Sequence, residues 1–255
     1  MATATAKKLD NEMAESYSRS KTRRTNWQTN WEAVRKHLRP NVPSFQGGNT
    51  RQGERGSQLT ESIYDSTAPW ALEQLASGLY SHMTDPTSRW FSLGVRGMAF
   101  EDMPYELRLW LEQVADRMYQ EFSNPATRFQ QTLKEVFLDL CSFGTGIQYG
   151  NWDRNLKAMN FRSYALSTVN IDEGYNGMVD TVYRDFDMTK RQLLQEFPGV
   201  SFTDQIDKAP DEKEYVVTHA VRPNSDFAGS LKKAFKSVHF IDEQKLVLAE
   251  GGYDV

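Results

Sequence analysis

The stretch 69–93, PWALEQLASGLYSHMTDPTSRWFSL, decides how the first half of this chain is interpreted. Its apolar residues recur near helical spacing, which predicts a helix with one apolar face. That face consists of Trp70, Leu72, Leu75, Leu79 and Met83. Pro86 ends the helix, because proline cannot continue it and favours extended geometry in the residue before it. The pair Trp90-Phe91 follows directly, so the stretch predicts a helix, a turn at Pro86 and a buried aromatic anchor.

The residues before this stretch predict a long polar helix and a loop. Residues 8–38 carry a sparse apolar stripe and stop before Pro40, which predicts one helix. Residues 40–57 are rich in Gly, Pro, Asn and Gln, a composition typical of a long loop. A second helix is expected over 59–83, with a kink or restart near Pro69.

Two more helices are expected between Pro104 and Gly144. Pro104 fits the first turn of the third helix. The apolar face of that helix consists of Leu107, Trp110, Leu111, Val114, Met118 and Phe122. The fourth helix covers 126–143 and ends at Gly144, and the sequence Gly144-Thr145-Gly146 predicts a helix C-cap and a tight turn into a strand. The short join between these two helices predicts an antiparallel pair.

The pattern changes after Gly150, where short alternating segments rich in β-branched and aromatic residues predict strands. A short helix over 189–197, capped by Thr189, interrupts them. Helices followed by mostly antiparallel strands predict an α+β fold. We expect three regions: a basic helix and loop (1–58), a helical region (59–150) and a strand-rich α+β module (151–255), truncated at its C-terminus because the sequence stops just after an expected strand.

Composition narrows the class of protein. The chain has 255 residues, of which 39% are hydrophobic, and no run approaches the ~18 apolar residues that a membrane helix needs. The single cysteine, Cys141, allows no disulfide within the chain, which is consistent with assembly in a reducing cytoplasm.

Charge is distributed unevenly along the chain. Residues 1–60 hold eleven Lys/Arg and five Asp/Glu, whereas the remainder holds 19 and 29. The segment 19–39 is the most basic part, and its two tryptophans lie one helical turn apart and share a face. We select from it, as contact residues, Arg19, Arg23, Arg24, Trp27, Trp31, Arg35 and Lys36. This pattern fits either an arm that contacts nucleic acid or capsid, or the solvated face of a helix.

Motifs for catalysis are not found. The sequence has no phosphate-binding loop, no nucleophile elbow and no histidine pair at metal-binding spacing, and its four histidines are far apart. Glu112 and Asp116 lie one helical turn apart, and such pairs of acidic residues are common on the solvent-exposed face of a helix. We therefore expect no enzyme, no cofactor and no metal site.

The order of several motifs resembles the portal, or head-to-tail connecting, proteins of short-tailed, T7-like bacteriophages. The motifs are DSTAP leading into LASGL (65–79), the Trp90-Phe91 turn, SNPATRF (123–129), FGTG (143–146), GMVDTV (177–182), VTHAV (217–221) and SVHF (237–240). The resemblance covers most of the chain and implies the N-terminal, wing-rich part of a portal.

The resemblance implies a structural ring, usually a dodecamer, at one capsid vertex in the virion, assembled in the host cytoplasm. Double-stranded DNA passes through such a ring during packaging and ejection. The expected partners are further copies of the chain, capsid and scaffolding proteins, terminase and then tail adaptor proteins, with no membrane.

Two other functions stay open. A nucleic-acid-binding module would use the basic arm with Trp27 and Trp31, and salt-dependent DNA binding by residues 1–60 would favour it. A metal-dependent hydrolase would need carboxylates such as Glu112 and Asp116 to converge with others in space.

Overall fold

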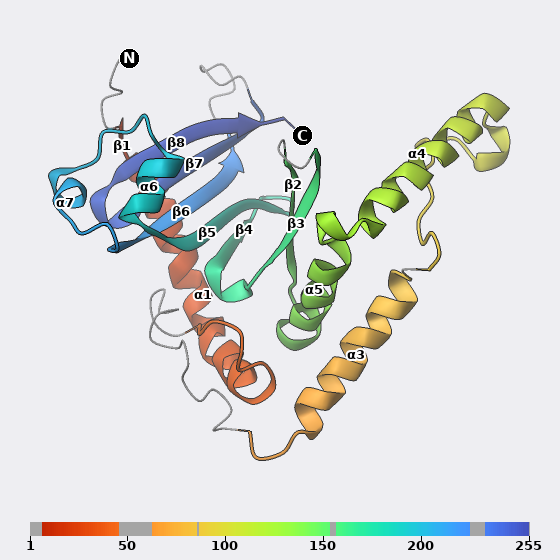
Figure 1. Ribbon diagram of the computed structural model, residues 1–255, viewed down its shortest axis with the longest axis horizontal. Coiled ribbons are helices and arrows are strands. Elements are labelled where there is room, and N and C mark those ends of the chain that lie inside the picture. Colours follow the sequence, from red (N-terminus) through yellow and green to blue (C-terminus); the bar gives the residue numbers. More distant parts are fainter. Residues whose placement is uncertain (1–6, 46–62, 86, 154–156, 225–232, 255) are drawn as a thin grey trace. The chain divides into compact units, whose positions relative to one another are not determined.

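The computed structural model describes residues 7–45, 63–85, 87–153, 157–224 and 233–254 (Figure 1). Much of the predicted loop 40–57 and the start of the helix predicted over 59–83 lie outside these residues, as does Pro86. The chain divides into two compact units that are discontinuous in sequence. Unit 1 comprises Met1–Ala33, Pro43–Ser57 and Ser167–Val255, and unit 2 comprises Val34–Val42 and Gln58–Leu166. The three regions expected from the sequence stay a prediction.

Unit 1 is built on an antiparallel sheet of six strands. In their order across the sheet the strands are β1 (Lys7–Lys8), β8 (Leu246–Tyr253), β7 (Phe235–Ile241), β6 (Glu214–Pro223), β5 (Val179–Thr189) and β4 (Val169–Glu173). The short 3₁₀ turns η3 (Leu166–Thr168) and η4 (Asp242–Gln244) precede β4 and β8. The β4–β5 connection turns at Gly177, whose φ of +71° suits glycine.

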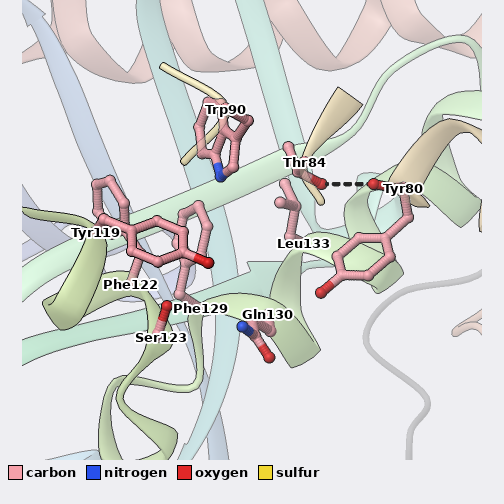
Figure 2. A pocket seen from close by; sticks show the side chains of 9 residues that line it. All are labelled: Tyr80, Thr84, Trp90, Tyr119, Phe122, Ser123, Phe129, Gln130 and Leu133. Atoms are coloured by element: carbon pink, nitrogen blue, oxygen red, sulfur yellow. Dashed lines mark hydrogen bonds between the residues drawn. The ribbon is translucent and has the colours of Figure 1, made fainter. Parts of the chain in front are cut away.

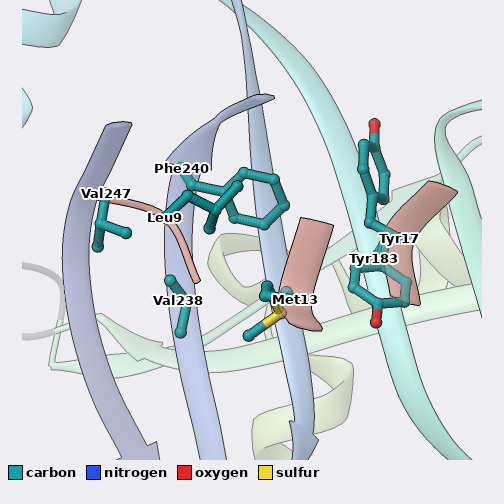
Figure 3. Packing of buried hydrophobic residues seen from close by; sticks show 8 residues of the cluster. Leu9, Met13, Tyr17, Tyr183, Val238, Phe240 and Val247 are labelled. Atoms are coloured by element: carbon teal, nitrogen blue, oxygen red, sulfur yellow. The ribbon is translucent and has the colours of Figure 1, made fainter. Parts of the chain in front are cut away.

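Side chains alternate between the two faces of this sheet along each strand. Both faces carry apolar residues, and helices cover each of them. On one face, Leu9 and the first turns of α1 (Asn11–Leu38) bury Met13 and Tyr17 against Tyr183 and Phe240 (Figure 3). On the other face, α6 (Lys190–Glu196) and α7 (Asp204–Asp207) bury a second apolar cluster. The second cluster consists of Leu193, Ile206, Tyr215, Val217, Ile241, Leu246 and Leu248.

The helices α1 and α6 confirm two sequence predictions. The single helix α1 matches the helix expected over 8–38. The helix α6 begins at a capping box, in which the Thr189 hydroxyl accepts from Gln192 N while the Gln192 side chain accepts from Thr189 N. Both helices therefore begin and end close to the signals that the sequence carries.

Unit 2 consists of three longer helices and a two-stranded antiparallel hairpin. Its elements are α3 (Thr67–Met83), η1 (Phe100–Asp102), α4 (Tyr105–Ser123), η2 (Pro125–Thr127), α5 (Phe129–Phe143), β2 (Ile147–Asp153) and β3 (Ala158–Tyr164). The helix α5 packs mainly against α3 and the hairpin. The prediction that the third and fourth helices, α4 and α5, pack against each other as an antiparallel pair is therefore wrong, because α5 makes only a minor contact with α4. The left-handed Arg128 (φ 59°) between η2 and α5 also delays the start of α5 to Phe129.

Helix periodicity predicts the apolar faces of α3 and α4 only in part. Leu72 and Leu111 are buried, but Trp70, Leu75 and Trp110 are exposed. The described part of the chain thus leaves large apolar side chains without cover at positions where a helical apolar stripe predicts burial. The mixed fold of helices followed by antiparallel strands agrees with the predicted α+β class.

Candidate functional site

The basic segment of α1 contains cations that serve the interior of unit 1. Arg24 is buried, and its guanidinium Nη1 donates to the Val169 carbonyl oxygen (2.9 Å) and to Asn170 Oδ1 (3.0 Å). Burial lowers the pKa of Arg24 to about 10, with Asp185 acting in the opposite direction. The guanidinium also lies 5.6 Å from the ring of Phe45. Arg24 therefore stabilises the start of β4 from within.

Two more cations at the end of α1 are occupied by contacts inside unit 2. Arg35 is buried and donates to the carbonyl oxygens of Pro40 (3.1 Å) and Val42 (3.2 Å). Arg39 donates to Asp139 Oδ1 (2.5 Å) and to Glu135 Oε2 (2.9 Å) on α5. These contacts fix the chain where it leaves α1, which is a structural role.

The exposed part of the basic segment forms a row on α1. Arg19, Arg23 and Trp27 are spaced four residues apart, so they follow one another along one face of the helix. We call these three residues the Trp27 row. Trp27 is 61% exposed and stacks on Trp31 with ring centroids 6.2 Å apart, while Arg23 forms an ion pair with Asp172 at 3.5 Å.

The remaining two candidates of the segment differ from each other in burial. Trp31 is partly buried and packs against Phe45, with ring centroids 5.5 Å apart. Lys36 is exposed. Of the seven contact residues predicted from the sequence, Arg19, Arg23, Trp27 and Lys36 are thus exposed, whereas Arg24 and Arg35 are turned to the interior.

A buried carboxylate lies under α1 and was not predicted from the sequence. Asp185 on β5 accepts hydrogen bonds from the Tyr17 hydroxyl (2.8 Å to each carboxylate oxygen) and from Thr218 Oγ1 (2.8 Å). Lys21 Nζ lies 3.4 Å from Asp185 Oδ2. Burial raises the pKa of Tyr17 well above its ordinary value, and the Asp185 charge adds to the effect. The network fixes α1 to the sheet.

The predicted aromatic turn of unit 2 belongs to a ring cluster. Phe122 of α4 stacks on Trp90, packs edge-to-face with Phe91 and stacks on Phe129, with ring centroids 6.4, 5.8 and 4.5 Å apart. Phe91 is partly buried, but Trp90 is 40% exposed, so the anchor is less buried than expected.

A small, mostly apolar pocket borders this cluster. Trp90, Phe122 and Phe129 contribute rings to it, and Tyr80 and Thr84 line another side (Figure 2). Thr84 Oγ1 donates to the Tyr80 carbonyl oxygen (2.9 Å) at the end of α3. No carboxylate, histidine, lysine or arginine side chain lines this pocket.

The two glycines after α5 have separate structural reasons. Gly144 ends α5 with φ +79°, a left-handed conformation that favours glycine. At Gly146 a Cβ would lie 2.5 Å from the Val136 carbonyl oxygen, so only glycine fits between α5 and β2. Both positions serve the junction between helix and strand.

The two acidic residues considered for a hydrolase lie on the surface of α4. Asp116 forms an ion pair with Arg89 at 2.8 Å, and Glu112 is exposed on the same helix. Among the described residues no group of three or more His, Cys, Asp or Glu side chains is placed to hold a metal ion.

Two histidines that are distant in sequence meet in the sheet of unit 1. His219 on β6 and His239 on β7 are cross-strand partners whose rings stack with centroids 4.1 Å apart. The His219 Nε2 atom lies 2.9 Å from Ser237 Oγ. Burial lowers the pKa of His219 to about 4, and His239 and Arg184 add to this effect. Sequence spacing gave no signal for this pair, because strand register created it.

An exposed apolar tip of unit 2 lies around the start of α4. Tyr105 is 71% exposed and Trp110 is 58% exposed. The tip consists of Val95, Met98, Phe100, Tyr105, Leu109 and Trp110, all exposed. All six lie within residues 95–110, and contiguous exposed apolar surface is typical of a binding site for another protein.

Within the residues that the structure describes, no helix is both long and apolar enough to span a membrane.

Comparison with known sequences places the chain in a family. A family model described as "Bacteriophage head to tail connecting protein" matches residues 10–255. A "Probable portal protein" of Bordetella phage BPP-1 is 28% identical over 268 aligned positions, which cover 99% of this chain and 46% of the relative. The "Portal protein" of Salmonella phage epsilon15 is 28% identical over 245 positions, which cover 92% of this chain and 43% of the relative. The chain thus spans less than half the length of these two relatives. Since the family model matches nearly the whole sequence, the chain belongs to the bacteriophage head-to-tail connecting protein family.

Proposed function

We propose that this chain is part of a phage portal subunit, which forms a ring at one capsid vertex. The observation that carries the proposal is the continuous match of residues 10–255 to the head-to-tail connecting protein family. The names of the two relatives, "Probable portal protein" and "Portal protein", support it. From the resemblance to phage portals we infer about a dozen copies, related by the cyclic symmetry that head-to-tail contacts between identical subunits can produce.

The proposed role is structural. Double-stranded DNA passes through the ring during packaging and ejection, and the ring contacts capsid and scaffolding proteins, terminase and then tail adaptor proteins. The ring assembles in the host cytoplasm and stays in the virion. Such a role needs interfaces more than chemistry, and the exposed apolar tip of unit 2 supplies a surface suited to an interface.

A nonsense mutation in the phage gene tests the proposed role in DNA passage. Cells infected with the mutant phage should accumulate capsids without packaged DNA, and expression of the intact protein from a plasmid should restore DNA-filled capsids. DNA-filled capsids that lack the protein entirely would contradict the proposal.

The role of the basic segment in assembly is best tested at its exposed cations. Arg24 and Arg35 are buried, so reversing their charge would disturb the fold of the subunit itself. A test of assembly should therefore change Arg19, Arg23 and Lys36 only, and we expect Glu at these positions to reduce ring or procapsid assembly. Normal assembly of this variant would favour the alternative, that the basic segment is only the solvent-exposed face of a helix.

A further inference from the structure

We propose that a row of side chains in the sheet of unit 1 is an acid-sensitive switch, in which protonation separates two stacked histidines and loosens the end of α6 from the sheet. The row consists of Arg184 on β5, His219 on β6 and His239 on β7, and we call it the histidine row. The inference concerns a single subunit, so it does not depend on the proposed ring.

Strand register creates the histidine row. Arg184 is the cross-strand partner of His219, and His219 is the partner of His239. Cross-strand partners share one face of a sheet, and neighbouring strands lie about 4.8 Å apart. The two imidazole rings are almost parallel, at 5°, with centroids 4.1 Å apart. Three groups that can carry positive charge are thus neighbours on three adjacent strands.

The histidine row borders the second apolar cluster and contacts α6. Phe186 and Val217, two positions along β5 and β6 from the row, are cross-strand partners that belong to the cluster or pack against it. Side chains two positions apart share a face, so the row lies on the face that α6 covers. Phe197, which directly follows α6, packs against the cluster and against the His239 ring, with ring centroids 5.7 Å apart. Phe197 therefore connects the row to α6.

The stacked pair suits neutral imidazoles. Two protonated rings at this spacing would place like charges in contact, with the Arg184 guanidinium on the next strand. Burial lowers the pKa of both histidines, and the charge of Arg184 adds to the effect. His239 also lowers the pKa of His219, which falls to about 4. Protonation is therefore disfavoured in the folded arrangement.

Other charged residues near α6 are engaged elsewhere or exposed. Lys190 Nζ lies 3.5 Å from Asp211 Oδ1 and donates to the Asp207 carbonyl oxygen (2.9 Å). Arg191 and Glu196 are exposed. The residue of β8 opposite His239 is an uncharged alanine, and the neutral Ser237 Oγ lies 2.9 Å from His219 Nε2. We therefore assign the pH response of this region to the histidine pair.

The helix α6 is the element that gives way. It has seven residues, and a helix this short depends on tertiary packing for its stability. The strands β6 and β7, by contrast, have neighbours on both sides in the sheet. A form in which His219 regains its ordinary pKa of 6.5 binds a proton that the closed form does not, so its population rises about twentyfold between pH 7 and pH 5.

Hydrogen exchange of backbone amides, followed by mass spectrometry, tests the switch in protein expressed from its complete reading frame. Exchange is measured at pH 7 and pH 5, and each rate is corrected for the intrinsic pH dependence of amide exchange. The protection of α6 amides should fall by about twentyfold at pH 5. The first turns of α1, which cover the opposite face of the sheet, should change little.

A double variant, His219→Gln with His239→Gln, should reduce the pH response of α6 to less than about threefold. The matched control is His82→Gln, at an exposed histidine of α3, which should keep the full response. Thermal unfolding at pH 7 checks that each variant folds. If the double variant does not fold, the comparison of α6 with α1 in the wild type decides the question.

Three results would overturn the inference. The protection of α6 in the wild type could be the same at both pH values. Alternatively, α6 and the first turns of α1 could lose protection equally, which would show unfolding of the whole unit instead of a local opening. A folded double variant that keeps the wild-type response would show that other groups are responsible.

Discussion

At the scale of single residues, burial separates cations that look alike in sequence. Arg23 and Arg24 are neighbours, yet Arg23 is exposed and Arg24 is held by Val169 and Asn170. The sequence could show that this segment is basic, but it could not show which cations turn inward, because their partners are about 145 residues away along the chain. Burial of Asp185 was missed for the same reason.

Replacing Arg24 by Ala should lower the free energy of unfolding by about 2–4 kcal/mol, because buried partners would lose charged hydrogen bonds. Arg23→Ala is the matched control, and it should change stability by less than about 0.5 kcal/mol, as an exposed position. Urea denaturation followed by circular dichroism measures both values. Equal effects of the two substitutions would show that Arg24 is not held as described.

Tyr17→Phe should destabilise the subunit by about 1–3 kcal/mol, because it removes the hydroxyl that donates to the buried carboxylate of Asp185. Tyr105→Phe, at an exposed tyrosine of the tip, is the control and should leave the stability of the unassembled subunit unchanged. The same urea titrations compare them. An unchanged midpoint for Tyr17→Phe would contradict the role of this network.

The stacked histidines make stability depend on pH. The pKa of His219 falls from its ordinary 6.5 to about 4 in the folded protein. Between these values the unfolded chain binds a proton that the folded chain does not, so the contribution of His219 is complete above pH ~6.5, falls as the pH drops toward ~4 and is constant below that. Burial raises the pKa of Asp139 to about 6, which acts in the opposite direction over part of this range.

A variant isolates the histidine contribution. The stability of the wild type minus that of His219→Gln should fall by on the order of 2–3 kcal/mol between pH 7 and pH 4. Urea denaturation at several pH values measures this difference, in which the effect of Asp139 cancels. A difference that does not vary with pH would refute the lowered pKa.

At the scale of elements, the sequence predicts helices and turns well where local chemistry determines them. Thr189 with Gln192 starts α6, and Gly144 ends α5. Periodicity predicts less about burial, since it marked Trp70 and Trp110 as parts of apolar faces although both are exposed. An apolar stripe indicates a helix face that is buried in the final assembly, whether the chain itself or a partner covers it. The pairing of His219 with His239 depends on strand register, which no local motif specified.

The junction between α5 and β2 offers a test at this scale. Gly146→Ala should cost more than about 2 kcal/mol, because its Cβ would collide with backbone at Val136. Gly199→Ala, where a Cβ meets nothing within 4 Å, is the control and should be neutral or slightly stabilising. Thermal unfolding compares the two. A neutral Gly146→Ala variant would mean that the close approach is relaxed in solution.

At the scale of the whole molecule, the features of the chain point to interfaces. The described residues hold no cluster suited to a metal ion, and the pocket of unit 2 lacks charged groups, whereas large apolar side chains are exposed on α3 and around the start of α4. Membership of the head-to-tail connecting family accounts for this pattern if the exposed surfaces are covered in an assembly.

The most direct test of this account is the native mass of protein expressed from its complete reading frame, combined with negative-stain imaging. The account predicts a ring of about a dozen copies with a central hole. Protein that remains monomeric even when its phage's scaffolding and capsid proteins are present would contradict it.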